Sequence, residues 1–139
     1  MNGLRLLLAA WLLAVSSGCA LVNPGVIEEI ESNPTGDRAA STLVMTLDDG
    51  TRLPLKFVRE DNLVHLGSGG RWWRRFQSPG PVTLLMRGRE YRGTAVAVRD
   101  NPGKRREVFQ QLRSSGTAWL KGVLVTVTLA DATGQESVR

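Results

Sequence analysis

Short runs of β-forming residues, each closed by a turn signal, constrain the fold of this chain more than any other feature of its sequence. In the run at 52–58, Leu53, Leu55 and Phe57 alternate with other residue types, which is the period of a half-buried strand. Asp48-Asp49-Gly50 precedes this run, and such a sequence is typical of a tight turn. We therefore expect strands at residues 42–47, 52–58, 63–66, 81–87, 90–99 and 119–129.

Helices are expected at three places along the chain. An amphipathic helix begins at Pro102, with Asp100 or Asn101 as its cap. A short helix is expected to begin at Trp72, and another at Pro24, because proline is favoured in the first helical turn. These elements predict an α+β fold: a small antiparallel split β-barrel of about six strands, with one amphipathic helix and a short Trp-bearing helix.

The barrel interior can be predicted from the alternation of residues along the strands. Gly93 and Gly122 fall inside strands, where glycine permits the sharp coiling that a closed barrel needs. Small residues at 93, 95 and 97 share one face of their strand. We expect six side chains to face the interior: Leu53, Leu55, Phe57, Leu84, Val96 and Val125.

The N-terminal segment has the pattern of a secretory signal peptide. Arg5 is the only charge in the first 27 positions, and an apolar run of ten residues, LLLAAWLLAV, follows it at 6–15. A membrane-spanning helix needs roughly 20 apolar residues, so we expect a cleaved signal and not a transmembrane anchor. Ser16-Ser17-Gly18 supplies the small residues that precede a cleavage site.

The single cysteine of the chain follows these small residues. Ser16-Ser17-Gly18-Cys19 resembles the lipobox of bacterial lipoproteins, in which the cysteine becomes modified with fatty acyl chains such as palmitate. Those proteins usually have Leu three places before the cysteine, where this chain has Ser16. The alternatives are an ordinary cleaved signal with an incidental cysteine, or a buried cysteine in an N-terminal helix.

The lipoprotein hypothesis predicts four segments and a location. They are a signal peptide at 1–18, a lipidated tether at 19–40, a barrel domain at 41–130 and a polar tail at 131–139. Ala20 and Leu21 follow the cysteine without an Asp. By resemblance to lipoprotein sorting patterns, this favours the outer membrane of the cell envelope, with the domain facing the periplasm.

The charge balance points to anionic partners. The chain has 18 Lys and Arg against 13 Asp and Glu, a net charge of +5. In an exported protein such an excess favours lipid headgroups or an anionic small molecule over nucleic acid. The alternative is that a modest basic excess serves only solubility.

The sequence offers no catalytic or metal-binding cluster. His65 is the only histidine and lies in an apolar strand, which favours a structural, hydrogen-bonded role over a catalytic one. Asp48 and Asp49 lie in a turn, where we expect them to stabilise the backbone. We therefore predict no catalytic residue and no metal ligand.

One stretch combines groups that could bind a ligand. Gly69 and Gly70 expose backbone N–H groups, and the short helix expected at Trp72 would point its own N–H groups toward them. Arginines supply charge-assisted hydrogen bonds, and indoles supply flat surfaces. An anionic planar small molecule would suit this combination; the alternative is one core tryptophan with a solvated basic face. The predicted site contains Arg52, Gly69, Gly70, Arg71, Trp72, Trp73 and Arg74.

From Thr42 to about Arg113 the chain resembles the deazaflavin-dependent nitroreductase family of the flavin-binding split β-barrel superfamily. The resemblance rests on strand order and on the stretches at 53–61, 69–76, 82–84 and 87–95. It implies a split barrel that binds a flavin or deazaflavin between loop and barrel. Members that bind deazaflavin carry a Gly-Arg-Lys-Ser-Gly-like loop that grips the phosphate; here that place holds Asp48-Asp49-Gly50-Thr51-Arg52. Two carboxylates would repel a phosphate, and only Arg52 could attract it.

Two classes of function follow from these patterns. The first is a membrane-anchored lipoprotein with a split-barrel binding or structural module that has lost its cofactor. The second is an envelope reductase that uses a flavin or deazaflavin. The acidic turn at 48–50 favours the first class, and the Gly-Arg-Trp-Trp-Arg stretch favours the second.

Replacing the cysteine tests the anchor. Acyl chains contribute roughly 0.8 kcal/mol per buried CH₂ group to membrane binding. In the full-length protein, we expect Cys19→Ser either to release the protein from membranes or to leave it uncleaved and held by its signal peptide. Cell fractionation and the mass of the mature chain measure both outcomes. Normal processing of the Cys19→Ser protein with unchanged membrane fractionation would contradict the lipoprotein hypothesis.

Overall fold

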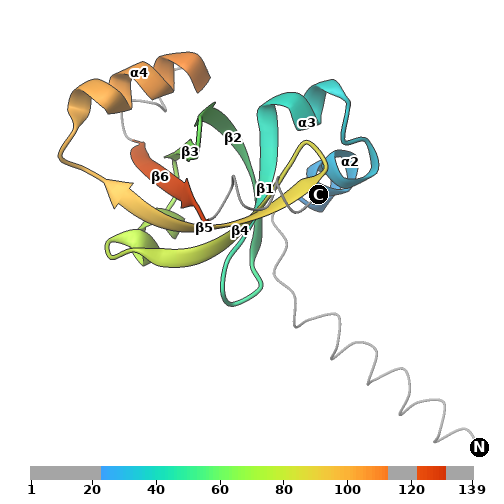
Figure 1. Ribbon diagram of the computed structural model, residues 1–139, viewed down its shortest axis with the longest axis horizontal. Helices are drawn as coiled ribbons and strands as arrows, with labels where there is room; N and C mark the ends of the chain where they lie inside the picture. Colours follow the sequence, from blue (N-terminus) through green and yellow to red (C-terminus); the bar gives the residue numbers. More distant parts are fainter. Residues whose placement is uncertain (1–22, 113–121, 131–139) are drawn as a thin grey trace, which may run out of the picture.

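The computed structural model describes residues 23–112 and 122–130, and in this part the chain forms a closed antiparallel β-barrel (Figure 1). The barrel order is β1-β2-β3-β6-β5-β4. This confirms the predicted α+β fold with a six-stranded antiparallel barrel. The strands are β1 (Thr42–Thr46), β2 (Arg52–Glu60), β3 (Leu63–Ser68), β4 (Gly80–Met86), β5 (Arg89–Val98) and β6 (Val123–Leu129).

The last strand closes the barrel. β6 pairs with β3 on one side, from Leu63↔Thr128 to Ser68↔Val123, and with β5 on the other, from Gly93↔Leu129 to Val98↔Leu124. The expected strand at 119–129 begins at Val123 within the described residues, and its first part lies outside them.

The barrel is split where β1 is shorter than its neighbours. Pairing of β1 with β2 stops at Thr42↔Lys56, and pairing of β1 with β4 stops at Val44↔Leu85. Strand β2 continues to Glu60, so its last four residues run beyond the end of β1. This leaves one end of the barrel open between β2 and the β4–β5 hairpin.

Alternating residues of the six strands fill the interior. Leu53, Leu84 and Val125 are buried in the main core, as expected. Leu55 and Phe57 are half-buried and pack against the same core. The buried members of this core are Leu43, Met45, Leu47, Leu53, Val64, Leu66, Phe76, Val82, Leu84, Met86, Tyr91, Ala95, Val125, Val127 and Leu129.

The expectation that Val96 faces the interior is wrong. Its neighbour Ala95 is fully buried in the main core, and adjacent residues of a strand point to opposite faces. The inward row of β5 therefore continues from Tyr91 through the small residues Gly93 and Ala95, and not through the valines. Close approach of β6 explains this choice, because a Cβ at Gly93 would lie 2.6 Å from Cγ1 of Val127 and 2.9 Å from the Thr128 carbonyl oxygen.

Two helices cover the outer face of β1. They are α2 (Pro24–Ser32) and α3 (Asp37–Ser41), and α3 was not expected from the sequence. Ile27, Ile30 and Ala39 are buried against Val44 in a second core. The part of the expected tether from Pro24 onward is thus folded against the barrel.

A third helix, α4 (Pro102–Leu112), covers β3 and β6 on another side of the barrel (Figure 1). Its expected apolar stripe is confirmed, because Val108, Phe109 and Leu112 pack with Leu124 of β6 in a third core. The helix is capped by Asn101, whose Oδ1 accepts a hydrogen bond from the Lys104 N–H at 3.1 Å.

The expected Trp-bearing helix is present as the 3₁₀ helix η1 (Trp72–Phe76) between β3 and β4. All three cores are formed by residues between Val26 and Leu129. A polypeptide that begins at Ala20 therefore retains every described core contact. None of the helices described in residues 23–112 and 122–130 is long and apolar enough to span a bilayer.

Shortening an inward and an outward side chain tests the assignment of the two faces. Leu84→Ala should cost about 2–5 kcal/mol of unfolding free energy, because Leu84 is fully buried. Val96→Ala should cost less than about 1 kcal/mol, since Val96 is only half-buried and lies outside the described cores. Thermal unfolding of the two variants measures the difference. Equal losses of stability would mean that Val96 is also a core residue.

Candidate functional site

The residues of the predicted ligand site lie on η1 and the loop before it. Gly69, Gly70 and Arg71 are exposed after the end of β3. Trp72 is half-buried, packs against the main core, and meets the ring of Phe76 edge-on at a centroid distance of 6.2 Å. Trp72 therefore contributes to packing, as does Trp73, which also lies against the main core.

Trp73 lies against two cationic side chains. The guanidinium carbon of Arg74 is 5.9 Å from the indole centroid, and that of Arg99, which directly follows β5, is 5.0 Å from it. Cations at this distance are attracted to the electron-rich face of an indole. The indole is thus engaged by side chains of the protein itself.

The structure does not bring Arg52 to the glycine loop through any described contact. Its guanidinium forms an ion pair with Glu31 of α2. Arg75, which is not among the residues predicted for the site, is the arginine of η1 that reaches the β1–β2 turn. Its Nη1 donates to Oδ2 of Asp49 at 2.6 Å.

Asp49 organises the turn between β1 and β2. Its Oδ1 accepts a hydrogen bond from the Thr51 N–H at 2.9 Å, which confirms the conformational role expected for this acidic turn. The hydrogen bonds from Thr51 and then from Arg75 lower the pKa of the Asp49 carboxyl to about 2. The turn therefore carries a negative charge throughout the ordinary pH range.

This donor set does not fit a cofactor phosphate at the β1–β2 turn. The turn presents an ionised carboxylate, and the two arginines next to it, Arg52 and Arg75, are paired with Glu31 and Asp49. A phosphate placed here would be repelled by the carboxylate and would have to displace an existing ion pair.

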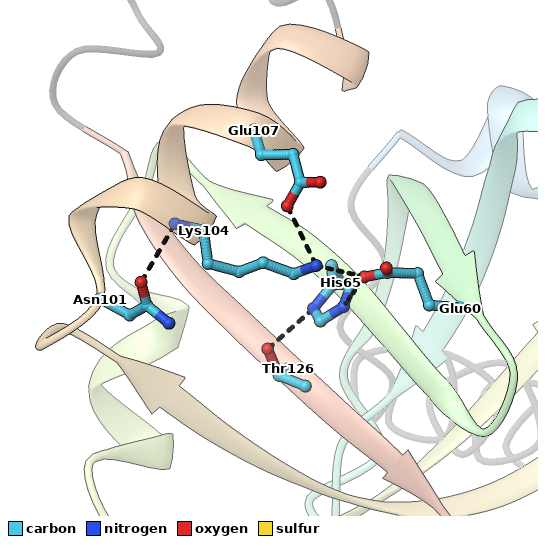
Figure 2. Close-up of polar contacts among 6 residues, drawn as sticks. All are labelled: Glu60, His65, Asn101, Lys104, Glu107 and Thr126. Carbon is cyan, nitrogen blue, oxygen red and sulfur yellow. Dashed lines mark hydrogen bonds and ion pairs between the residues drawn. The ribbon is translucent and has the colours of Figure 1, made fainter.

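His65 lies at the centre of a polar network beneath α4 (Figure 2). It is 3% exposed, and its Nδ1 is 3.0 Å from Oγ1 of Thr126, its cross-strand partner on β6. Its Nε2 is 2.7 Å from Oε1 of Glu60, a contact whose geometry is not that of a hydrogen bond.

Lys104 joins this network from the first turn of α4. Its Nζ is 2.6 Å from Oε1 of Glu60 and 3.1 Å from Oε2 of Glu107. The bond from Lys104 is the largest cause of the lowered pKa of Glu60, and Glu60 is the largest cause of the raised pKa of Lys104. The network thus ties α4 to β2, β3 and β6.

A hydroxyl, an imidazole and a carboxylate in series are also the groups of a nucleophilic triad. The burial of His65 under α4 argues against that role, because a substrate must reach the imidazole. The network supports the structural role expected for His65. Among the described residues, no group of three His, Cys, Asp or Glu could hold a metal ion.

The open end of the barrel contains a hollow of about 270 Å³ that sequence analysis did not predict. It lies where β2 and the β4–β5 hairpin extend beyond β1. The alternation of inward residues on β2 continues from Phe57 to Arg59, and this pattern in the sequence could have indicated an arginine at the end of the barrel interior. The lining residues are Phe57, Arg59, Met86, Arg87, Arg89 and Tyr91, and we call this hollow the basic mouth.

A second hollow of about 340 Å³ lies near the other end of β1. The residues that line this second hollow are Thr46, Leu47, Asp48, Pro81, Val82, Thr83, Arg92 and Gly93. No residue of the predicted site lines either hollow.

Comparisons with known proteins identify the fold. No protein-family model and no curated protein matches the chain. A solved structure described as a general stress protein 26, from Jannaschia sp. CCS1, superposes with a TM-score of 0.50 and 12% identity, over 77% of this chain and 75% of that chain. A FAD-binding protein from Mesorhizobium loti superposes with a TM-score of 0.48 and 14% identity, over 78% of this chain and 90% of that chain. At so low a sequence identity, this similarity concerns the barrel fold alone and does not specify a ligand.

The depressed pKa of Asp49 predicts how stability depends on pH. A carboxyl whose pKa falls on folding adds stability at pH values above its ordinary pKa of 3.8, and this contribution disappears as the pH falls toward about 2. Asp49→Asn should therefore lower the melting temperature at pH 6 and bring it closer to that of the unmodified protein near pH 2. Asp48→Asn removes the same charge one residue away and is the matched control. An equal effect of both substitutions at pH 6 would contradict this role of Asp49.

Proposed function

We propose that this protein is an envelope lipoprotein, acylated at Cys19, whose split barrel is a binding module without flavin or deazaflavin. The observation that carries the second part is the pairing of Asp49 with Arg75 at the turn where the related family grips its cofactor phosphate. The acyl chains on Cys19 would insert into the lipid of the outer membrane, and the barrel domain would face the periplasm.

The anchor is supported by the sequence at residues 5–19 and by the position of the folded domain. Cys19 follows a short basic start, an apolar run and small residues. The first described helix begins five residues after it, at Pro24. Acylation at Cys19 would therefore hold the domain close to the membrane surface.

The absence of a flavin-type cofactor is supported by the charges around η1. Arg52 and Arg75 are paired with carboxylates, and Arg74 and Arg99 lie against the indole of Trp73. Binding a phosphorylated ring would require several of these contacts to break. The alternative function is an envelope reductase, and its support is the resemblance of the stretches at 53–61 and 69–76 to the nitroreductase family.

A thermal shift experiment separates these two functions. A ligand at 100 times its dissociation constant adds about 2.7 kcal/mol of stability, which raises the melting temperature of a domain of this size by several degrees. We expect no shift with flavin mononucleotide or a deazaflavin at millimolar concentration. The experiment uses the polypeptide from Ala20, and its visible absorbance reports any cofactor that remains bound after purification.

A clear shift with either cofactor would make the reductase the leading function. In that case Arg71→Ala should weaken binding and reduce its salt dependence, because an exposed charge is screened by salt. Trp73→Ala should weaken binding without changing the salt dependence, because stacking does not involve a net charge. A shift that neither substitution alters would place the cofactor elsewhere.

A further inference from the structure

The basic mouth is formed by the ends of two inward-facing rows. On β2 the inward row of Leu53, Leu55 and Phe57 continues with Arg59, and on β5 the row that includes Tyr91 begins with Arg89. Inside the barrel these rows are apolar, and at its open end they become cationic. Arg87, in the β4–β5 turn, adds a third guanidinium to the same hollow.

Backbone carbonyls and a phenol orient two of these arginines. Arg59 donates from Nε to the Asp61 carbonyl at 2.9 Å and from Nη1 to the Tyr91 hydroxyl at 3.3 Å. Arg87 donates from Nη2 to the Ala40 carbonyl at 3.2 Å. Within the described residues, neither arginine forms an ion pair with a carboxylate. These contacts orient both side chains, and no carboxylate in the described part of the chain compensates their positive charges.

This charge pattern differs from that at the β1–β2 turn. There, Arg75 is neutralised by Asp49 at 2.6 Å. In the basic mouth no carboxylate is among the lining residues. Two fixed guanidinium groups facing one hollow suit an anion with several acceptor oxygens, because each guanidinium can donate two parallel hydrogen bonds.

The remaining walls of the basic mouth are apolar or aromatic. Phe57 lies under the Arg87 guanidinium at 5.6 Å, and Tyr91 lies under that of Arg59 at 5.0 Å. Met86 is buried beside them and supplies a polarisable surface. A ligand with an anionic head and a small apolar or aromatic part would contact both kinds of wall within about 270 Å³.

We propose that the basic mouth binds the phosphate group of an amphiphilic ligand, with Arg59 and Arg87 as the phosphate-binding residues. The phosphate lies between the two guanidinium groups, and the apolar part of the ligand lies against Phe57, Met86 and Tyr91. Such a phosphate has two sources, a lipid headgroup or a free small molecule.

The lipid source rests on the proposed function, because it depends on the acylated anchor. A Cβ at Gly88 would lie 2.8 Å from Cβ of Pro34, so the β4–β5 turn packs against the segment that joins α2 to α3. Figure 1 shows this turn beside both helices. Pro24 lies five positions after Cys19, a separation of at most about 18 Å for an extended chain. The anchor would hold this side of the barrel near anionic headgroups.

The test uses the polypeptide from Ala20 and two kinds of probe. The soluble probe is 1-naphthyl phosphate, with 1-naphthol as its uncharged counterpart. The lipid probe is vesicles of phosphatidylcholine with phosphatidylglycerol, compared with vesicles of phosphatidylcholine alone. Because the polypeptide lacks Cys19, the result is independent of acylation and can fail or succeed separately from the Cys19→Ser experiment.

Arg59→Gln and Arg87→Gln each remove one proposed phosphate contact. Arg106→Gln removes the same charge from an exposed position on α4, across the barrel from the β4–β5 turn, and is the matched control (Figure 1). We expect each of the first two variants to weaken binding by about tenfold or more, because hydrogen bonds to charged groups are among the strongest. The control should change binding by less than about twofold.

The probe that shows this pattern identifies the source of the phosphate. If Arg59→Gln and Arg87→Gln weaken the binding of 1-naphthyl phosphate, the natural ligand is a free small molecule. If they weaken only the binding of anionic vesicles, the ligand is a lipid headgroup. If a glutamine variant unfolds, Arg59→Lys and Arg87→Lys retain the charge but lose the paired hydrogen bonds of the guanidinium, and each should weaken binding more than Arg106→Gln does. No binding of either probe by the unmodified polypeptide, or an equal loss in Arg106→Gln, would overturn the proposal.

Discussion

Close packing of β5 against β6 is the contact on which the barrel depends. Gly93 leaves no room for a side chain beside Val127 and the Thr128 carbonyl, so the two strands can approach at this position. Without β6, strands β3 and β5 would each expose an unpaired edge. The main core also depends on this strand, since Val125, Val127 and Leu129 are three of its buried members. Two small inward residues, Gly93 and Ala95, make space for these larger ones.

The helices complete the barrel from outside by two different kinds of contact. The contact of α2 and α3 with β1 is mainly apolar, with Ile27 and Ile30 buried against Val44. The contact of α4 combines an apolar core at Phe109 with the polar network around His65. Burial of an imidazole is favourable only when its nitrogens have polar neighbours, and Thr126 and Glu60 supply them. The apolar contacts of Phe109 and the ion pair of Lys104 with Glu60 together hold α4 over β3 and β6.

Arginine has two distinct roles in this molecule. Around η1 and the β1–β2 turn, Arg52 and Arg75 form ion pairs that hold neighbouring elements together. At the open end of the barrel, Arg59 and Arg87 are oriented by neutral groups and keep their charge available. The net charge of +5 is thus not distributed evenly over possible binding surfaces. The partners of each arginine therefore decide whether its charge is available to an anion.

The sequence by itself determined the order and type of most elements, because strand period, turn residues and helix caps are local properties. The strands, α4 and the Trp-bearing helix were all predictable in this way, whereas α3 was not, since its five residues carry little periodic signal. The tertiary structure decided which face of β5 is inward, because that choice depends on the approach of β6 and not on hydrophobicity, and Val96 was misplaced for this reason. It also decided which arginines are neutralised. Arg75 and Asp49 are 26 residues apart in the chain and meet only when the barrel closes. No local pattern could therefore have distinguished this paired guanidinium from those of Arg59 and Arg87, which form no ion pair with a carboxylate among the described residues.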